Sequence, residues 1–233
     1  MLRAVIFDFD GVIADDERLH LEGFRHALAA HGLEISEAEY FTRYLGFDDR
    51  DGFKAMLRDA GRRADDGMLE ELIREKHRAF RRLVGERVRI YPGVHTLLAD
   101  LRGGPTPVAT AIGSGALRGE IELILDLADL RSSFDRIVSA EDVRRGKPDP
   151  ETFVTACASL AMVAPGLEAD DCLVIEDSMA GLSAATAAGM KTIAVCNSYS
   201  AQDLEADLVI DSLEQLDRAR CEALWPIATD GGE

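Results

Sequence analysis

Two aspartates close a strongly apolar stretch near the start of the chain. Residues 5–7, Val-Ile-Phe, predict a strand buried on both faces, and Asp8 and Asp10 follow it with one residue between them. Gly11 then lets the chain turn away. Two carboxylates at the end of a buried strand cost desolvation free energy unless a cation or a chemical role compensates them. The pattern therefore favours a site for one metal ion or one phosphoryl group over a plain acidic turn.

Two further groups of residues have the chemistry to hold an anion. Ser114 and Gly115 follow the strand predicted over 107–113 and precede a helix, so they offer a hydroxyl and free backbone N–H groups. Lys147 lies in a Gly-Lys-Pro-Asp-Pro turn directly before another predicted helix. Each feature alone also fits a structural role, as an N-cap or a solvated charge. Because the carboxyl ends of parallel strands share one edge of a sheet, we expect these residues to meet the aspartates there.

A second pair of acids, Glu176 and Asp177, stands at the carboxyl end of the strand predicted over 172–176. At the same sheet edge this pair would join Asp8 and Asp10, although an acidic turn is the alternative. Four carboxylates in one place need a hard divalent cation, and Mg²⁺ with oxygen ligands and retained waters fits that need. The sequence therefore predicts a Mg²⁺ site.

Strands and helices alternate along most of the chain, and this alternation determines where the polar residues meet. Strands separated by helices of roughly 10 to 15 residues predict βαβ units and a mainly parallel sheet. After the first strand and the Tyr91-Pro92-Gly93 turn, the predicted strands cover 107–113, 136–138, 172–176, 192–196 and 207–210. The predicted helices cover 94–101, 117–128, 151–161 and 179–188, with a closing helix from Leu213. The tail from Thr229 is predicted to be disordered.

The segment 15–90 shows helical periodicity and no strand pattern. Lys76 is the one polar member of the apolar stripe over 69–83, and its long side chain is expected to carry the ammonium out to solvent. The sequence therefore predicts a small all-helical domain over 15–90. This domain is inserted into an α/β core domain made of 1–14 and 91–233.

The composition is that of a globular protein, with 47% hydrophobic and 30% charged residues. A formal net charge of −17 argues against nucleic acid and anionic membrane surfaces as partners. No apolar run reaches membrane-spanning length, and the first strand begins too early to leave room for a signal peptide. The cysteines form no C-x-x-C pair, which favours reduced thiols in a cytoplasmic protein; they are Cys157, Cys172, Cys196 and Cys221.

Taken together, these motifs resemble the haloacid dehalogenase superfamily of phosphotransferases. The similarity is to the branch with a helical cap inserted after the first strand, which contains β-phosphoglucomutases and phosphoglycolate-type phosphatases. It covers nearly the whole chain and implies a Rossmann-like parallel sheet core with an all-helical cap domain. The residues that carry the resemblance are Asp8-Phe9-Asp10-Gly11-Val12, Ser114, Lys147, Glu176-Asp177 and Gly181.

The resemblance implies a catalytic role for four residues. Asp8 would be the nucleophile that forms an aspartyl-phosphate, and Asp10 the general acid and base. Ser114 and Lys147 would hold the phosphoryl oxygens. A carboxylate can attack a phosphoryl group only if charge repulsion is cancelled, which Mg²⁺ and Lys147 can do. The implied metal ligands are Asp8, Asp10 through its main-chain carbonyl, and Asp177, with Glu176 either a direct ligand or a support for one.

Further substrate contacts are expected in the helical insertion. By the resemblance, His20 stands at the hinge of the cap, although a histidine on an amphipathic helix is more often structural. The loop 45–51 carries one arginine against three aspartates, whereas the mutases that the chain resembles carry cations there for a second phosphate. The remaining histidines show no metal-ligand spacing and are predicted to be structural. The expected substrate contacts are His20, Gly46, Arg50, Ser114 and Gly115.

The favoured function is a Mg²⁺-dependent phosphatase that hydrolyses a small phosphorylated metabolite of the sugar or glycolate type. A sugar-phosphate mutase of the β-phosphoglucomutase type stays open as the alternative. A non-enzymatic phospho-aspartate receiver fits less well, because receivers are shorter, have no helical insertion and lack the second aspartate of Asp-x-Asp. A dehalogenase would need neither Asp10 nor the pair Glu176 and Asp177. The sequence predicts neither the particular substrate nor the oligomeric state.

Overall fold

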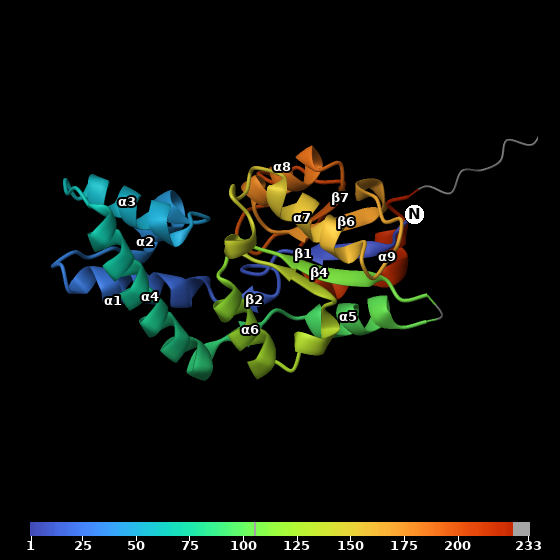
Figure 1. The fold of residues 1–233 in the computed structure, drawn as a ribbon, viewed down its shortest axis with the longest axis horizontal. Coiled ribbons are helices and arrows are strands. Elements are labelled where there is room, and N and C mark those ends of the chain that lie inside the picture. Colours follow the sequence, from blue (N-terminus) through green and yellow to red (C-terminus); the bar gives the residue numbers. More distant parts are fainter. Residues whose placement is uncertain (105, 226–233) are drawn as a thin grey trace, which may run out of the picture.

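Six strands form one parallel sheet with the first strand in its middle (Figure 1). The computed structural model describes residues 1–104 and 106–225, so the tail predicted to be disordered lies outside the described residues. The strand order is β5-β4-β1-β6-β7-β8, and every neighbouring pair is parallel. The strands are β1 (Ala4–Phe7), β4 (Ala109–Gly113), β5 (Arg136–Val138), β6 (Cys172–Glu176), β7 (Lys191–Val195) and β8 (Leu208–Ile210). The predicted parallel α/β architecture is confirmed.

Helices cover both faces of this sheet, because its strands are apolar on both sides (Figure 1). Along β1, Val5 and Phe7 pack into one hydrophobic cluster, and Ala4 and Ile6 pack into another on the opposite face. All four residues of β1 are fully buried, as their apolar sequence predicts. One face is covered by α5 (Val94–Arg102) and α6 (Arg118–Leu127), the other by α7 (Glu151–Leu160) and α8 (Met179–Ala187).

The insertion between β1 and α5 is helical, as its periodicity predicts, and lies beside one end of the sheet (Figure 1). Its helices enclose a hydrophobic cluster of their own, which includes Phe24, Phe53 and Leu72. A short antiparallel pair, β2 (Ala14–Asp15) and β3 (Arg89–Ile90), joins the two ends of the insertion. Strands of two residues carry no periodicity, so the sequence did not reveal them. The helices are α1 (Glu17–Ala29), α2 (Glu37–Glu39), α3 (Asp49–Asp59) and α4 (Asp66–Arg87), with a π-helical turn over Tyr40–Tyr44.

Lys76 does not reach solvent, so the prediction from its long side chain is wrong. The residue is 1% exposed, and its ammonium donates to Asp49 Oδ1 at 2.6 Å. It also contacts His20 Nδ1 at 2.7 Å. The rings of Phe24 and Phe80 flank it, with centroids 5.1 and 5.3 Å from Nζ. A buried ammonium needs such partners, and Asp49 is too distant in sequence for a helical pattern to reveal the pair.

The chain closes with two short elements, so the single helix predicted from Leu213 is wrong. Leu213–Gln215 form a 3₁₀ turn, and α9 covers only Arg218–Glu222. Ser212 caps the first element and Asp217 caps the second, each by accepting a backbone N–H. Two capping residues in close succession therefore start two elements. Three further 3₁₀ turns cover Arg131–Ser133, Ala140–Asp142 and Ala169–Asp171.

None of the helices described over 1–104 and 106–225 is both long and apolar enough to cross a lipid bilayer. All four cysteines are free thiols, and three of them are buried. The Sγ atoms of Cys157 and Cys172 lie 3.7 Å apart, in contact but not bonded.

Candidate active site

The carboxyl ends of β1 and β6 bring three of the predicted site residues together. Phe7 lies opposite Ile175 in the parallel register, so Asp8 and Glu176 leave the sheet side by side. One carboxylate oxygen from each of Asp8, Glu176 and Asp177 lies within 4.8 Å of the others. All three residues are buried. Three of the four carboxylates predicted to meet at this edge therefore form one buried group, the acidic cluster, and the prediction is wrong for Asp10, which lies in a different group.

Lys147 reaches this acidic cluster from the loop between β5 and α7. Its Nζ donates to Asp8 Oδ1 and to Glu176 Oε1, each at 2.7 Å. Burial alone would lower the pKa of Lys147, but the charges of Asp8 and Glu176 outweigh burial and raise that pKa. The ammonium therefore stays charged and fixes the orientation of both carboxylates. The predicted meeting of the lysine turn with the aspartates is present in the structure.

The acidic cluster keeps an excess of negative charge despite this lysine. Burial raises the pKa of Asp8 well above its usual range, and the charge of Glu176 raises it further. Burial and the charges of Glu176 and Asp8 also raise the pKa of Asp177. A divalent cation held by hard oxygen ligands would balance this charge and keep the carboxylates ionised. The donor set therefore fits Mg²⁺.

Glu176 has little capacity left for a metal ion. Its Oε2 accepts three hydrogen bonds, from Asp177 N at 2.9 Å, Ser178 N at 2.8 Å and Ser178 Oγ at 2.9 Å. Its Oε1 accepts from Lys147. A Cβ at Gly181 would lie 1.6 Å from Glu176 Oε1, so only glycine leaves room for this arrangement. The geometry favours Glu176 as the residue that positions Lys147, with Asp8 and Asp177 left to bind a cation.

Asn197 and Ser198, just beyond the end of β7, hold the other side of the site. Asn197 Nδ2 donates to the main-chain carbonyl of Gly11 at 2.7 Å, and Ser198 Oγ donates to Asp177 Oδ2. Gly11 has a φ of 81°, and a Cβ there would lie 1.9 Å from Asp177 Oδ2. Asn197 and Ser198 were not among the predicted site residues. They follow a predicted strand as Ser114 does, so the same rule would have found them.

Ser114 stands at the same sheet edge on the other side of β1. The register of β1 and β4 puts the end of β4 level with Asp8. Ser114 is fully buried, and its Oγ accepts the backbone N–H of Ala116 at 2.9 Å. Because that bond uses a lone pair, the hydroxyl proton can still be donated to a bound anion. Gly115, next to it, is exposed.

Asp10 lies beside His20 rather than in the acidic cluster. His20 Nε2 is 3.9 Å from Asp10 Oδ1 and 3.7 Å from Asp16 Oδ2. The Lys76 ammonium can only donate, so His20 Nδ1 accepts from it and the ring proton lies on Nε2, facing both carboxylates. Asp10, Asp16 and His20 are close enough together for a metal ion. However, His20 offers no free nitrogen to such an ion while Nε2 is protonated.

Asp16 is expected to make stability fall as pH rises, and Asp16→Asn should remove this effect. Its side chain is 0% exposed, and neither oxygen has a hydrogen-bond donor among the described residues. Burial, followed by the charge of Asp10, raises the pKa of Asp16 to about 8. The folded protein thus keeps a proton that the unfolded chain loses near pH 4, and stability declines between about pH 4 and pH 8.

The measurement is the free energy of unfolding of wild type and Asp16→Asn at pH 4, 6 and 8. The free energy of unfolding of Asp16→Asn, measured relative to that of wild type, should rise by on the order of 2 to 4 kcal/mol from pH 4 to pH 8. A difference that stays constant across this range would show that Asp16 is ionised in the folded protein throughout.

The predicted cap residues Gly46 and Arg50 form no hydrogen bond or ion pair with Asp8, Glu176 or Asp177. The Arg50 guanidinium pairs with Asp66 inside the insertion. Gly46 has a φ of 80° just after the π-helical turn. Their role as substrate contacts stays a prediction. Two neighbouring cations are paired within the insertion as well, Arg43 with Asp59 and Lys54 with Asp51.

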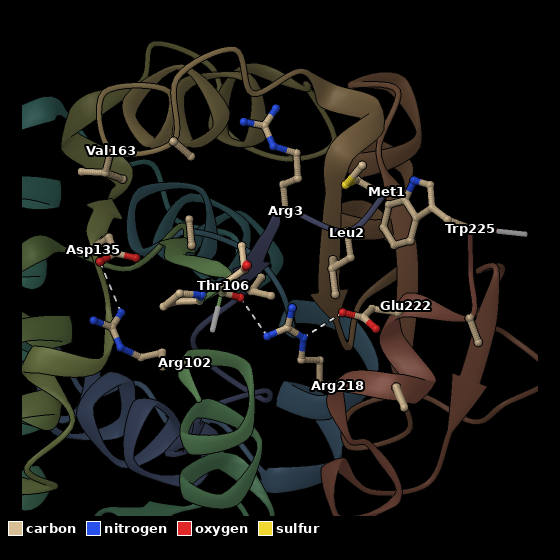
Figure 2. A pocket seen from close by; sticks show the side chains of 16 residues that line it. Met1, Leu2, Arg3, Arg102, Thr106, Asp135, Val163, Arg218, Glu222 and Trp225 are labelled. Carbon is tan, nitrogen blue, oxygen red and sulfur yellow. Dashed lines mark hydrogen bonds and ion pairs between the residues drawn. The ribbon is translucent and has the colours of Figure 1, made fainter. Parts of the chain in front are cut away.

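A cavity of about 1010 Å³ lies at the opposite edge of the sheet, where β1 and β4 begin (Figure 2). Charged side chains in its lining are paired: Arg102 with Asp135 at 3.2 Å, and Arg218 with Glu222 at 2.7 Å. Parallel sheets bind ligands beyond the carboxyl ends of their strands, which is the Asp8 edge. We therefore assign the candidate active site to that edge and not to the cavity.

The model of the haloacid dehalogenase-like hydrolase family matches residues 5–195, which include every residue of the acidic cluster. The chain belongs to this family. The resemblance stated from the sequence motifs is thereby confirmed, and so is the prediction of a hydrolase. The match extends over the helical insertion and all strands of the sheet except β8.

Three relatives of this hydrolase align over most of their own length. It is 35% identical to Protein CbbY (plasmid) of Cupriavidus necator, over 87% of this chain and 81% of the relative. It is 32% identical to the phosphorylated carbohydrates phosphatase of Thermotoga maritima, over 82% of this chain and 84% of the relative. It is 30% identical to the beta-phosphoglucomutase of Bacillus subtilis, over 92% of each chain.

The fold is also shared with solved structures. A CbbY variant from Rhodobacter sphaeroides in complex with xylulose-(1,5)bisphosphate superposes with a TM-score of 0.82 and 25% identity. The superposition covers 93% of this chain and 96% of that chain. The relatives thus include both activities that the sequence left open, a phosphatase and a mutase.

Proposed function

We propose that this hydrolase is a Mg²⁺-dependent phosphatase that cleaves the monophosphate ester of a small hydroxylated molecule. The observation that carries the proposal is the Lys147 ammonium held between Asp8 and Glu176, next to Asp177. A charged lysine on a candidate nucleophile suits a reaction in which a carboxylate must approach an anionic phosphoryl group. The named activity of the Thermotoga maritima relative supports the same reaction.

Asp8, Asp177 and the main-chain carbonyl of Asp10 would hold the Mg²⁺ ion. The raised pKa values of Asp8 and Asp177, and the hydrogen bonds that already occupy both oxygens of Glu176, support this division of roles. When bound, the ion supplies positive charge that offsets repulsion between carboxylate and phosphoryl group. Lys147, the Ser114 hydroxyl and the Gly115 backbone N–H would bind the phosphoryl oxygens.

The reaction would proceed in two displacements at phosphorus. In the first, an Asp8 oxygen bonds to phosphorus, the ester P–O bond breaks, and Asp10 gives its proton to the departing alcohol oxygen. In the second, water gives a proton to Asp10 and attacks the phosphorus of the aspartyl-phosphate. Phosphate then leaves and Asp8 is restored. Covalent catalysis of this kind replaces one difficult displacement by two easier ones.

Asp10 must change its protonation state between these steps. Burial alone would raise the pKa of Asp10, but the hydrogen bond from the His20 N–H and the charge of Lys76 outweigh burial and lower it. The free protein therefore holds Asp10 as a carboxylate, the form needed for the second step. A phosphoryl dianion arriving beside Asp10 would raise this pKa by like-charge repulsion and favour the protonated form needed for the first.

Residues 15–90 would act as a cap domain on the core domain formed by 1–14 and 91–233. The separate hydrophobic cluster of the insertion and its joining strands β2 and β3 support a unit that moves as one body. Closure of such a unit excludes water and encloses the alcohol half of the substrate. His20 lies in α1 of this unit and faces Asp10, so movement of the cap would change the distance between His20 and Asp10.

A monophosphate suits this cap better than a bisphosphate does. Arg50 and its neighbouring cations are already paired with aspartates, so a second phosphate would have to break ion pairs. Two unit charges about 4 Å apart repel by roughly 4 kcal/mol at an effective dielectric of 20. The bisphosphate bound to the Rhodobacter sphaeroides protein and the mutase activity of the Bacillus subtilis relative make the contrary outcome worth testing.

The test is phosphate release from a panel of esters, measured with and without Mg²⁺. The panel holds sugar and polyol monophosphates, glycolate-type phosphates and a sugar bisphosphate, beside an assay for glucose 1-phosphate isomerisation. We expect release from monophosphates, dependent on Mg²⁺ and independent of any bisphosphate activator. Efficient isomerisation that a catalytic bisphosphate stimulates, with little free phosphate, would instead establish the mutase.

A further inference from the structure

Glu120, in the first turn of α6, has one buried carboxylate oxygen that no described donor reaches. Its side chain is 7% exposed, and no donor among the described residues reaches its Oε1. His77 Nε2 lies 3.9 Å from this oxygen but is only 2.7 Å from Asp49 Oδ2. One N–H cannot serve both acceptors well, so the shorter contact to Asp49 takes it. A buried carboxylate left in this state is costly unless another group donates to it.

Glu120 ends a chain of polar contacts that starts at the proposed acid and base. Asp49 accepts from Lys76 at 2.6 Å and contacts His77 at 2.7 Å, and Lys76 contacts His20, which faces Asp10. The contacts join α1, α3 and α4 of the insertion to α6 of the core. We name Asp49, Lys76, His77 and Glu120 the interface cluster.

The interface cluster joins the insertion to α6, the helix that begins just after Ser114 at the sheet edge of the candidate site. The phosphoryl group would be held at Asp8, Ser114 and Lys147, so the rest of the molecule extends from the sheet edge toward the insertion. Glu120 follows Ser114 by six residues, within the first turn of the helix that begins at this edge. A group on the alcohol half can therefore meet Glu120 when the insertion closes.

The charges of the interface cluster select the chemistry of that group. Lys76 is already shared between Asp49 and His20, which leaves Glu120 as a negative acceptor without its own cation. A carboxylate in this position repels a phosphate and binds a hydroxyl, because hydroxyl-to-carboxylate hydrogen bonds are short and strong. An aromatic or alkyl group would leave the oxygen unpaired.

We propose that Glu120 is a specificity-determining residue whose carboxylate accepts a hydrogen bond from a hydroxyl group of the substrate. The inference rests on the proposed phosphatase function and adds a residue that selects hydroxylated over plain alcohol groups. Asp49 supports this role of Glu120 because it accepts the hydrogen bond of the Lys76 ammonium. His77 supports it because its Nε2 is in contact with Asp49 rather than with Glu120.

The experiment compares two esters in wild type, Glu120→Gln and Glu120→Ala. One ester is a polyol monophosphate that wild type hydrolyses, and the other is p-nitrophenyl phosphate, which has no hydroxyl group. Glu120→Ala should raise KM for the polyol ester about tenfold or more. It should leave kcat and KM for p-nitrophenyl phosphate unchanged. Glu120→Gln keeps an acceptor and the side-chain shape, so it should fall between. Glu122→Ala, which removes an acid that pairs with Arg131 on the same helix, is the matched control and should change neither ester.

The outcomes separate the inference from the function on which it rests. Equal losses on both esters, or no loss on either, would overturn the specificity role while wild-type hydrolysis still supports the phosphatase. If wild type hydrolyses neither ester nor any other monophosphate, the proposed function itself fails, and the inference fails with it. If Glu120→Ala does not fold, Glu120→Gln decides instead. Its KM relative to wild type should then be raised for the polyol ester and unchanged for p-nitrophenyl phosphate.

Discussion

Asp8→Asn is expected to abolish hydrolysis while the fold stays intact. The amide keeps the shape of the side chain but is neither a nucleophile nor an anionic metal ligand. Loss of the covalent path should lower kcat by about a thousandfold or more, which is about 4 kcal/mol of barrier. The measurement is steady-state phosphate release from the best ester of the panel, with circular dichroism to check the fold.

The matched control is Asp126→Asn, which makes the same chemical change at an exposed position on α6 and should leave the rate unchanged. Substitution at Asp8 also removes a buried charge that opposes Glu176, so folding is not expected to suffer. Near-normal turnover by a folded Asp8→Asn would contradict the nucleophile assignment.

Removal of divalent metal is expected to abolish activity and to lower the melting temperature. Without a cation, the carboxylates of Asp8, Glu176 and Asp177 repel one another around one lysine. Restoring Mg²⁺ at a hundred times its Kd should raise Tm by about 5 to 10 °C. Ca²⁺ should bind and stabilise the protein but support little turnover, because its longer and looser coordination disturbs the in-line geometry.

The measurement is a titration of chelator-treated protein with each ion, followed by thermal unfolding and by phosphate release. In Asp8→Asn the Mg²⁺-dependent rise in Tm should shrink, because one ligand has lost its charge. Full activity in excess chelator would show that the acidic cluster serves another purpose.

The central strand and its acids were predictable because they depend on local sequence. The apolar run before Asp8 makes β1 buried on both faces, and the register of a parallel sheet then places Glu176 next to Asp8. Lys147 and Ser114 were found by a related rule, which places residues just beyond strands or just before helices at one edge.

Contacts between distant elements were not predictable in the same way. Lys76 sits on an apolar stripe, where a lysine usually reaches water, yet Asp49 from another helix holds it inside. Glu120 occupies a position that looks like an ordinary acid on an amphipathic helix, and only the packing of α4 on α6 puts His77 beside it. Such pairs depend on how the insertion sits on the core, and one sequence carries no signal for that arrangement.

The most direct test of the account is to trap the covalent intermediate. Protein with Mg²⁺ and a hydrolysed monophosphate is quenched in acid during turnover, digested and analysed by mass spectrometry. We predict that the peptide containing Asp8 gains the mass of one phosphoryl group, that the gain disappears in Asp8→Asn, and that borohydride reduction locates it to residue 8. Continuous phosphate release with no modified peptide, or with the modification on another residue, would contradict phosphoryl transfer to Asp8.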